Sequence, residues 1–297
     1  MSARKDGRMA QWTIEAPMSL DFDDVTGLRV RLIAGSVAVV ATTGKPTVNV
    51  SSITGDPLTV THEDGLLTIA HENLTWDGLL KWLRPQRHAA TVTITVPRRC
   101  PTQVGVVSAT AVMSGISART SVKSVSGEIT LDGVTGDVDA NTVSGALEAQ
   151  GINGKLNFNT VSGDLTVADG WLERLDANAV NGDVTADIDL DPMGGMQVTT
   201  VSGEVTLRLP AEADARVHLH SVSGEVRSEF AELRYASAPA SHRVSGNLGA
   251  GSGNVSVTTM SGRVILLRRA ERRTTPGDAP IGHEGHDNGS EMEGEAS

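Results

Sequence analysis

The chain has 297 residues, of which 39% are hydrophobic and only 3% aromatic, and it contains 32 glycines. This composition predicts a folded chain whose core is filled by aliphatic side chains, which suits regular β-structure. The formal net charge of −11 argues against nucleic acid as a ligand, because binding to phosphate backbones needs clustered lysines and arginines.

The two ends of the chain, residues 1–11 and 270–297, are expected to be disordered. The first is a polar leader without the apolar stretch of a secretion signal, and the second is an acidic tail without a large apolar cluster. Cys100 is the sole cysteine, so the fold cannot depend on an internal disulfide. These features predict a cytoplasmic protein.

Residues 12–110 are expected to form an N-terminal β portion that includes a cap for the repeats that come after it. Apolar and polar residues alternate in the segments LRVRLIAGSVAVV, PTVNVSSI, PLTVTHEDGLLTIA and ATVTITVP. Such alternation predicts strands with one buried face, and the Gly-containing pairs between the segments predict turns.

The segment 74–84 breaks this β pattern. Its apolar residues recur at helical spacing among basic ones and are followed by Pro85, which predicts a short amphipathic helix. The candidate interaction residues of this helix are Trp76, Leu79, Leu80, Trp82 and Leu83. We expect the helix to cap an open end of the fold, where unpaired backbone groups would invite association. The alternative is that it binds a partner or an anionic membrane surface.

Residues 111–269 repeat the phrase V-S-G, and this repeat predicts the fold. From Val125 the chain divides into nine-residue units that begin VSGEITL, VTGDVDA, VSGALEA, INGKLNF and VSGDLTV. Odd positions in each unit are apolar or glycine and even positions are polar or small, as in a strand with one buried face. Strands that are joined by two-residue corners wind around their own core. The sequence therefore predicts an all-β solenoid with about two strands per coil, continuous with the N-terminal portion.

The glycine of each phrase is expected to face inward, where the lack of a side chain lets the two walls approach. The pairs Asn141-Thr142, Asn159-Thr160, Asp132-Gly133 and Gln150-Gly151 are expected to form the corners. The repeat glycines are Gly127, Gly136, Gly145, Gly154, Gly163, Gly182, Gly203, Gly224, Gly246 and Gly262. We expect their coils to stack in chain order.

The residues that come directly after the glycines are expected to form an outward column. Its members are Glu128, Ala146, Asp164, Asp183, Glu204, Glu225, Asn247 and Arg263. Carboxylates stacked about 5 Å apart repel one another, so the column stays hydrated, contacts nearby cations or recruits a partner. The acids Asp164, Asp183, Glu204 and Glu225 are therefore candidate interaction residues.

The repeat predicts no metal, cofactor or catalytic site. Calcium-binding β-rolls place an aspartate two residues after the glycine, but Ile129, Leu147 and Leu165 stand there in this chain and cannot ligate a hard cation. His218 and His220 share one side of a predicted strand but lack a third ligand at an identifiable spacing. Every Ser-Gly pair has an equal claim to be a nucleophile, and none lies in a G-x-S-x-G elbow.

The segments TVTITVP, SVSGEITL, NTVSGALEA, NTVSGDLTV and TVSGEVTLRLP resemble the bacterial putative-adhesin family of β-strand-repeat proteins of unknown function. The segments GRMAQWTIEAP and LKWLRP further resemble actinobacterial members of that family. The resemblance covers most of residues 12–268. It implies a single-stranded right-handed parallel β-helix or a related β-solenoid, and it brings no established catalytic residues.

We therefore expect a non-enzymatic β-solenoid scaffold or interaction module without a cofactor, which binds an unidentified protein partner or copies of itself. The alternatives are an adhesin-like surface-binding module, or a protein weakly associated with membranes through helix 74–84. An enzyme acting on polysaccharides would need clustered Asp, Arg or Lys side chains in adjacent coils, and the outward column offers acids with few basic companions.

Overall fold

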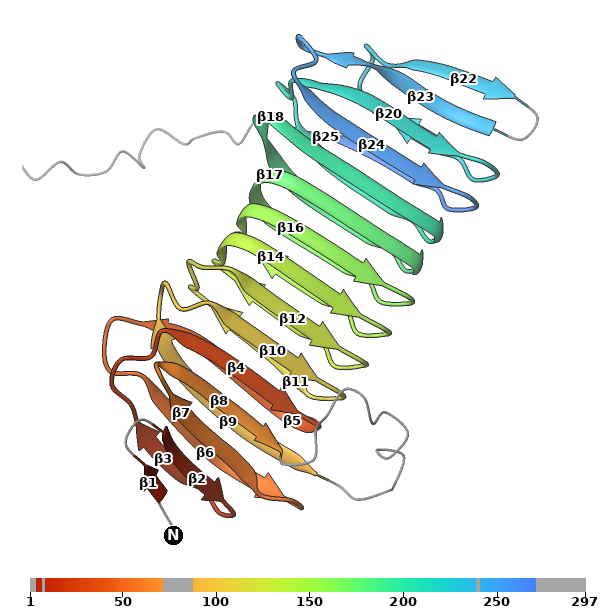
Figure 1. The fold of residues 1–297 in the computed structure, drawn as a ribbon. Helices are drawn as coiled ribbons and strands as arrows, with labels where there is room; N and C mark the ends of the chain where they lie inside the picture. Colours follow the sequence, from red (N-terminus) through yellow and green to blue (C-terminus); the bar gives the residue numbers. More distant parts are fainter. Residues whose placement is uncertain (1–3, 7–8, 72–87, 239–240, 271–297) are drawn as a thin grey trace, which may run out of the picture.

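A computed structural model describes residues 4–6, 9–71, 88–238 and 241–270 of the chain. These residues form strands and turns, without a helix among them, and the strands stack along one long axis (Figure 1). The all-β prediction is confirmed, and the architecture is β-solenoid-like. The helix expected over 74–84 and the tail from residue 271 onward lie outside the described residues.

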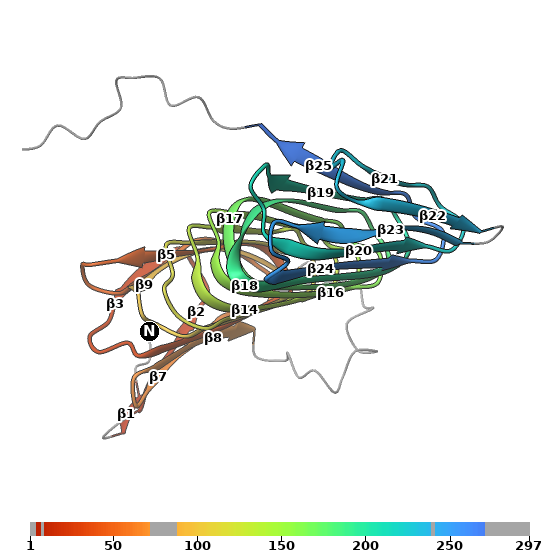
Figure 2. The ribbon, with the colours of Figure 1, turned by 90° about the horizontal axis from the view of Figure 1, so that it is seen from above.

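Two walls of strands enclose the core, as the view along the stack shows (Figure 2). From the N-terminal end, wall A contains β1 (Arg4–Asp6), β2 (Met9–Ile14), β7 (Leu58–Glu63), β8 (Leu66–His71), β4 (Gly27–Leu32), β10 (Thr102–Val106), β12 (Thr120–Ser124), β14 (Thr135–Thr142), β16 (Asn153–Thr160), the second halves of β17 (Leu165–Asn181) and β18 (Val184–Ser202), β24 (Gly253–Thr259), β20 (Ala215–Ser221), β23 (Ser241–Leu248) and β22 (Arg234–Ala238). Wall B contains β3 (Met18–Asp21), β6 (Thr47–Thr54), β9 (Ala89–Pro97), β5 (Ala34–Thr42), β11 (Thr110–Ser114), β13 (Ile129–Asp132), β15 (Leu147–Gln150), the first halves of β17 and β18, β19 (Val205–Pro210), β25 (Val264–Arg269) and β21 (Val226–Ser228).

In the middle of the stack each coil contributes one strand to each wall. Neighbouring strands of a wall are parallel, and residues one coil apart lie side by side, as Ile129, Leu147 and Leu165 do in wall B. The expected alternation sets which side chains are buried, because successive residues of a strand point to opposite faces.

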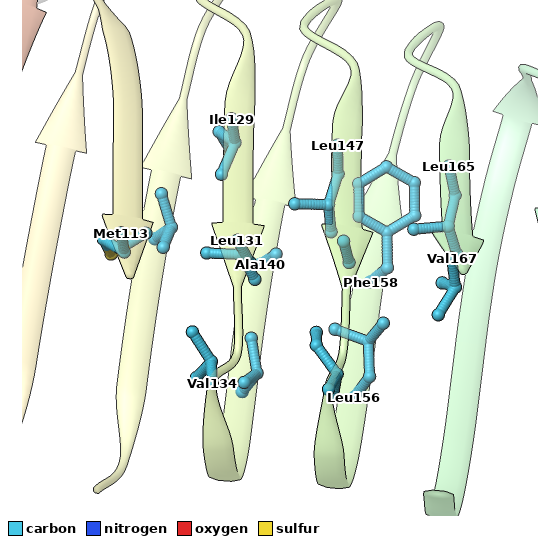
Figure 3. Close-up of a cluster of buried hydrophobic side chains, with 14 of the residues drawn as sticks. Met113, Ile129, Leu131, Val134, Ala140, Leu147, Leu156, Phe158, Leu165 and Val167 are labelled. Carbon is cyan, nitrogen blue, oxygen red and sulfur yellow. The ribbon is translucent and has the colours of Figure 1, made fainter. Parts of the chain in front are cut away.

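Aliphatic side chains from both walls fill the space between them (Figure 3). Leu147 of wall B and Leu156 and Phe158 of wall A are at most 1% exposed. Burial of each such side chain contributes about 1.5–3 kcal/mol. The inward positions expected for Ile129 and Leu131 are confirmed, since both are fully buried.

Antiparallel strands close the N-terminal end of the stack. In wall A, β2 pairs with β7 and β1 pairs with β2, and in wall B β3 pairs with β6. The leader was expected to be disordered over 1–11, but Arg4–Asp6 and Met9–Ile14 form strands here. The cause is that β7 offers an unpaired edge to which Met9–Ile14 adds a full ladder of backbone pairs.

The coils do not stack in chain order near either end, which corrects the sequence-based expectation. At the C-terminal end, β24 pairs with β18 and β20, and β25 pairs with β19 and β21. The last coil of the chain therefore lies between two earlier coils, which is visible as blue strands between green and cyan ones in Figure 1. At the N-terminal end, β4 likewise lies between β8 and β10, and β5 between β9 and β11.

Gly246 does not belong to the stacked glycines. It lies in β23, which pairs antiparallel with β20 and places Gly246 opposite Val217. Antiparallel pairing by β22 and β23 covers the edge of β20 that would otherwise be free. As a result Asn247 also leaves the expected column of outward residues.

The corners of the coils are only partly as expected. Gly133 and Gly151 do form corners, with φ of +59° and +62°, a backbone conformation that favours glycine. Asn141 and Thr142, by contrast, are the last residues of β14, and the bend falls on Val143 and Ser144. Asn159 and Thr160 end β16 in the same way. The threonine stays in the strand because its side chain is buried between the walls.

Candidate functional site

A buried threonine or serine holds the corner from inside at four of the phrases. The hydroxyl of this residue accepts a hydrogen bond from the backbone N–H of the glycine three residues later. The donor-to-acceptor distances are 2.9 Å for Gly127 N to Ser124 Oγ, 2.7 Å for Gly163 N to Thr160 Oγ1, 2.8 Å for Gly224 N to Ser221 Oγ and 3.0 Å for Gly262 N to Thr259 Oγ1. This bond satisfies a buried N–H that the strand ladders leave unpaired.

The serine of the phrase ties one coil to the next. Ser144 Oγ donates to the carbonyl oxygen of Val125 at 3.2 Å, and Ser162 Oγ donates to that of Val143 at 3.3 Å. The hydroxyl of Ser126 makes the same bond to Val107. Each exposed serine therefore has a structural partner in the preceding coil.

The glycine of the phrase allows the coils to approach. A Cβ atom built on Gly145 would lie 2.2 Å from the carbonyl oxygen of Gly127, and one on Gly163 would lie 2.1 Å from that of Gly145. No carbon atom fits at such a distance from an oxygen. Gly182, Gly203, Gly262 and Gly224 continue this column at the same spacing. The expected structural role of these glycines follows from their contacts with the neighbouring coil and not with the opposite wall.

Gly136 and Gly154 form a second, shorter column near the opposite corners. They pair with each other in the ladder between β14 and β16, and both have φ above +100°. A Cβ atom on Gly154 would lie 2.6 Å from the carbonyl oxygen of Gly136. Close stacking and backbone conformation therefore both require glycine at these positions.

From Val143 onward, the apolar residue that begins each stacked phrase is exposed, although the sequence pattern placed it inward. Stacking brings these residues into one line along the edge of the molecule. We call this line the valine ridge, and its members are Val143, Val161, Val180, Val201, Met260 and Val222. Their exposed fractions lie between 37% and 58%. At an interstrand spacing of about 4.8 Å the ridge is roughly 24 Å long.

The acids at the N-terminal half of the outward column serve the stack itself. Asp164 Oδ1 accepts a hydrogen bond from the backbone N–H of Asp183 at 2.8 Å, and Asp183 Oδ1 accepts one from the N–H of Glu204 at 2.7 Å. Each carboxylate thus satisfies a backbone donor of the next coil. Both aspartates are exposed.

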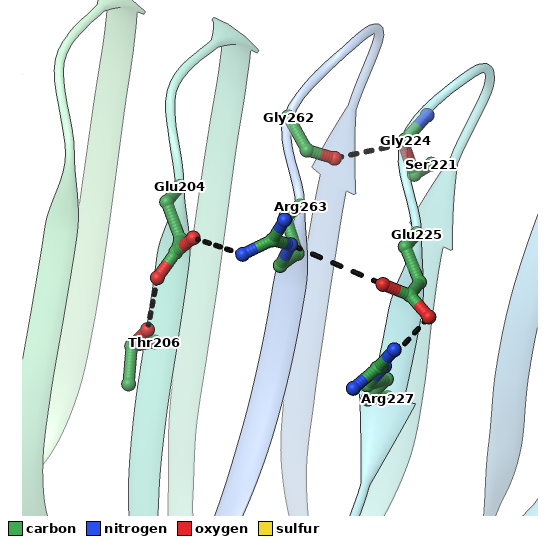
Figure 4. Close-up of polar contacts among 8 residues, drawn as sticks. All are labelled: Glu204, Thr206, Ser221, Gly224, Glu225, Arg227, Gly262 and Arg263. Atoms are coloured by element: carbon green, nitrogen blue, oxygen red, sulfur yellow. Dashed lines mark hydrogen bonds and ion pairs between the residues drawn. The ribbon is translucent and has the colours of Figure 1, made fainter.

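An arginine interrupts the acidic column at its C-terminal end (Figure 4). Because the last coil lies between two earlier ones, Arg263 stands between Glu204 and Glu225. Its Nη1 lies 3.2 Å from Glu204 Oε2, and its Nε lies 4.0 Å from Glu225 Oε2. Glu225 also pairs with Arg227 at 2.6 Å. The exchange of coils therefore replaces a contact between like charges with two ion pairs.

The residues that the structure describes form no cluster of three or more His, Cys, Asp or Glu side chains suited to a metal ion. Burial raises the pKa of the Cys100 thiol to about 11, which keeps it protonated and unreactive. Burial, together with the nearby His88, lowers the pKa of His71 to about 4. Neither ring nitrogen of His71 has a hydrogen-bond partner among the residues that the structure describes.

Among the described residues there is also no helix long and apolar enough to cross a membrane. Trp76, Leu79, Leu80, Trp82 and Leu83 lie outside the described residues, so their expected role stays a prediction. The chain leaves the described part after His71 and returns at His88.

Sequence reasoning found the glycines and acids but missed the valines as surface residues. A signal was present, because the apolar residue of V-S-G recurs although the two hydroxyl residues and the glycine already account for the corner.

In the family comparison, a model described as Toastrack DUF4097 matches residues 47–266. The chain belongs to the Toastrack DUF4097 family. None of the curated proteins compared with the chain matches it.

Solved structures resemble this Toastrack chain at low sequence identity. A protein from Parabacteroides distasonis named as a putative lipid binding protein is 14% identical, with a TM-score of 0.50 over 85% of this chain and 97% of its own. A putative adhesin from the same species is 14% identical with a TM-score of 0.32, over 89% and 98% of the two chains. A putative cell adhesion protein from Clostridium sporogenes is 11% identical with a TM-score of 0.25, over 85% and 100%. The first of these supports the fold alone, and the actinobacterial subtype stays a prediction.

Proposed function

We propose that this Toastrack protein is a non-enzymatic interaction module that binds a protein partner along the valine ridge. The observation that carries the proposal is the division of roles within each phrase. The threonine or serine, the outer serine and the glycine all make contacts that hold the coils together. The side chain of the apolar residue forms no hydrogen bond and is exposed at every coil from Val143 to Val222, and a contiguous line of exposed apolar side chains is typical of an interaction surface.

Charges beside the ridge indicate what the partner presents. Glu128, Asp164 and Asp183 each stand three positions after the apolar residue that begins their phrase. None of the three makes an ion pair with another described residue. We therefore propose a partner that places aliphatic side chains on the valines and lysines or arginines on these acids. The acids would act as a rim that excludes mismatched partners, since charged rims contribute more to specificity than to affinity.

The repetition of the surface supports binding over catalysis. Each coil presents an apolar residue at the ridge, and most coils add a serine and an outward acid, whereas an active site depends on one set of groups that differs from its surroundings. An array of equal contacts suits an extended partner, or a second copy of the chain that lies along the same edge. The area of the ridge is of the order of a few hundred Å², so flanking residues must complete a stable interface.

The test compares a ridge variant with a matched control. Val161→Ser and Val180→Ser together remove two central members of the ridge. Val40→Ser and Val112→Ser together remove two comparably exposed valines of wall B that lie away from it. Wild type and both variants are used for affinity capture with mass spectrometry and for light scattering.

We expect a partner, or a dimer, that is retained by wild type and by the control variant and is lost with the ridge variant. A partner or dimer that survives in the ridge variant would refute the proposal. The absence of both for wild type would refute it equally, because a functional ridge must have an occupant.

Three further expectations stay as proposals. The right-handed winding of the coils rests on the strong preference of parallel crossover connections for that hand. Residence in the cytoplasm is checked by cell fractionation, and recovery at the outer cell surface would favour the adhesin-like alternative. Association with membranes through segment 74–84 is checked by liposome sedimentation with a Trp76→Ala and Trp82→Ala variant.

A further inference from the structure

A hollow lies on the outer face of wall A where the N-terminal strands meet the regular coils. It has a volume of about 230 Å³ and is lined by residues of β4, β10 and β12. In these adjacent strands Arg31, Gly105 and Lys123 lie side by side, and so do Arg29, Gln103 and Ser121. The hollow contains no member of the valine ridge, so binding in the hollow is independent of binding along the ridge.

Strand alternation explains why the hollow is there. Val104 and Val106 of β10 point into the core and are at most 2% exposed, so Gly105 between them occupies an outward position. Because Gly105 has no side chain to project outward, the outer face is recessed at that point. The long side chains of Arg31 and Lys123 on either side form the walls, and Gly105 forms the floor.

The charged residues that line the hollow are all basic. Arg29, Arg31 and Lys123 line it, and no carboxylate does. Arg29 Nε donates to Gln103 Oε1 at 3.3 Å. Within the described part of the chain neither Arg31 nor Lys123 forms an ion pair, whereas nearby Arg119 pairs with Asp139 at 2.9 Å. Residues two strands apart are separated by about 10 Å, so these cations repel one another across the hollow unless an anion lies between them.

We propose that this hollow binds a phosphate monoester group. Such a group carries about −1.5 to −2 charges near neutral pH and offers three acceptor oxygens. Arginine side chains bind phosphate through paired N–H donors, and lysine adds a point charge. Gln103 and Ser121 offer polar groups on the same face. A carboxylate has a single charge and would leave most of the positive charge uncompensated.

The group reaches the hollow from the solvent side, since Gln103 and Lys123 are exposed. The rest of the bound molecule then extends away from wall A and makes few contacts with it. A soluble phosphate monoester and the head group of phosphatidic acid offer the same chemistry, so the source of the phosphate is decided by experiment.

The experiment measures binding of inorganic phosphate to the full chain by calorimetry in a buffer of low ionic strength. A second arm measures sedimentation with phosphatidylcholine vesicles with and without phosphatidic acid. Arg31→Gln combined with Lys123→Gln removes two charges from the hollow. Gly105→Val fills the hollow without changing charge, and its backbone conformation tolerates a side chain because the φ of Gly105 is not positive. Arg216→Gln is the control, an exposed arginine on the outer face of the same wall in β20.

We expect wild type and Arg216→Gln to bind phosphate with a Kd of about 1 mM or below. The double charge variant should bind at least about tenfold more weakly because it removes charge-assisted contacts, and Gly105→Val should bind at least about tenfold more weakly because its side chain occupies the hollow. Loss in Gly105→Val, with an unchanged circular dichroism spectrum, separates a shaped site from general attraction of anions. Binding of free phosphate alone would indicate a soluble ligand, and added binding to vesicles that contain phosphatidic acid would indicate a lipid head group.

Two results would overturn the proposal. The first is a wild-type chain that binds neither phosphate nor the phosphatidic acid vesicles. The second is equal weakening in Arg216→Gln and in the variants of the hollow, because the binding would then reflect surface charge without a site.

Discussion

Substitution of Gly145 by alanine tests whether close stacking of the coils holds this fold together. The new Cβ atom would lie 2.2 Å from the carbonyl oxygen of Gly127, whereas carbon and oxygen atoms ordinarily approach to about 3.3 Å. The oxygen belongs to the backbone and cannot rotate away. The two coils must therefore separate locally by about 1 Å.

That separation has a calculable cost. The hydrogen bonds from Ile129 N to Ala146 O and from Ser144 N to Val125 O flank Gly145, and both are 2.9 Å long. At about 4 Å they no longer count as hydrogen bonds, and each loss costs about 1 kcal/mol. Strain from the added methyl group costs about 1–3 kcal/mol more. We expect Gly145→Ala to lower the free energy of unfolding by about 3–5 kcal/mol, measured by urea denaturation with far-UV circular dichroism.

Gly133→Ala is the control for this prediction. Gly133 has a φ of +59°, but a Cβ atom there would meet no other atom within 4 Å. Alanine at that position therefore carries only the cost of a left-handed backbone, about 1 kcal/mol. A cost for Gly145→Ala equal to or smaller than that for Gly133→Ala would show that the contact between glycine columns is not what limits substitution.

Further variants test the core, the acidic column and a buried histidine. Phe158→Ala should lower the free energy of unfolding by about 3–5 kcal/mol in a urea titration, because the side chain is fully buried; a cost below about 1 kcal/mol would contradict that burial. Arg263→Gln should change stability by no more than about 1 kcal/mol, since the ion pairs with Glu204 and Glu225 are exposed, and the change should shrink in high salt; a salt-independent loss would contradict the electrostatic reading. The pKa of His71 falls from 6.5 to about 4 on folding, so the unfolded chain takes up this proton first as the pH falls. The contribution of His71 to stability is complete above pH 6.5 and decreases toward pH 4 by at most about 3 kcal/mol. His71→Leu should remove this part of the pH dependence of stability. An unchanged pH profile in that variant would show that another group causes the dependence.

The sequence predicted the buried positions of the regular coils well. Alternation placed Ile129, Leu147 and Leu165 inward, and all three are buried. The alternation pattern gives the wrong side for Val143 and Val161, because alternation holds only while the chain is extended and the chain bends at the corner. A bend at Val143 and Ser144 changes which side successive residues face, so the glycine is buried while the valine before it is exposed.

The order of the coils was not predictable from the repeat. The phrases around Gly224, Gly246 and Gly262 are closely similar, and any of these three could stack on the coil of Gly203. One residue did carry information. Arg263 occupies the position that holds an acid in most other phrases, and repulsion between Glu204 and Glu225 favours the arrangement in which it lies between them.

The position of the last coil decides when this protein can finish folding. During synthesis, strands β18 to β21 leave the ribosome before β24 and β25, but β24 is the strand that joins β18 to β20. The nascent chain must therefore hold an open gap in each wall until residues 253–269 have emerged. A chain that stops before Gly253 would keep the earlier coils but lose the link to β20 and β21. Completion of the C-terminal end thus depends on the emergence of residues 253–269, unlike a solenoid that grows coil by coil.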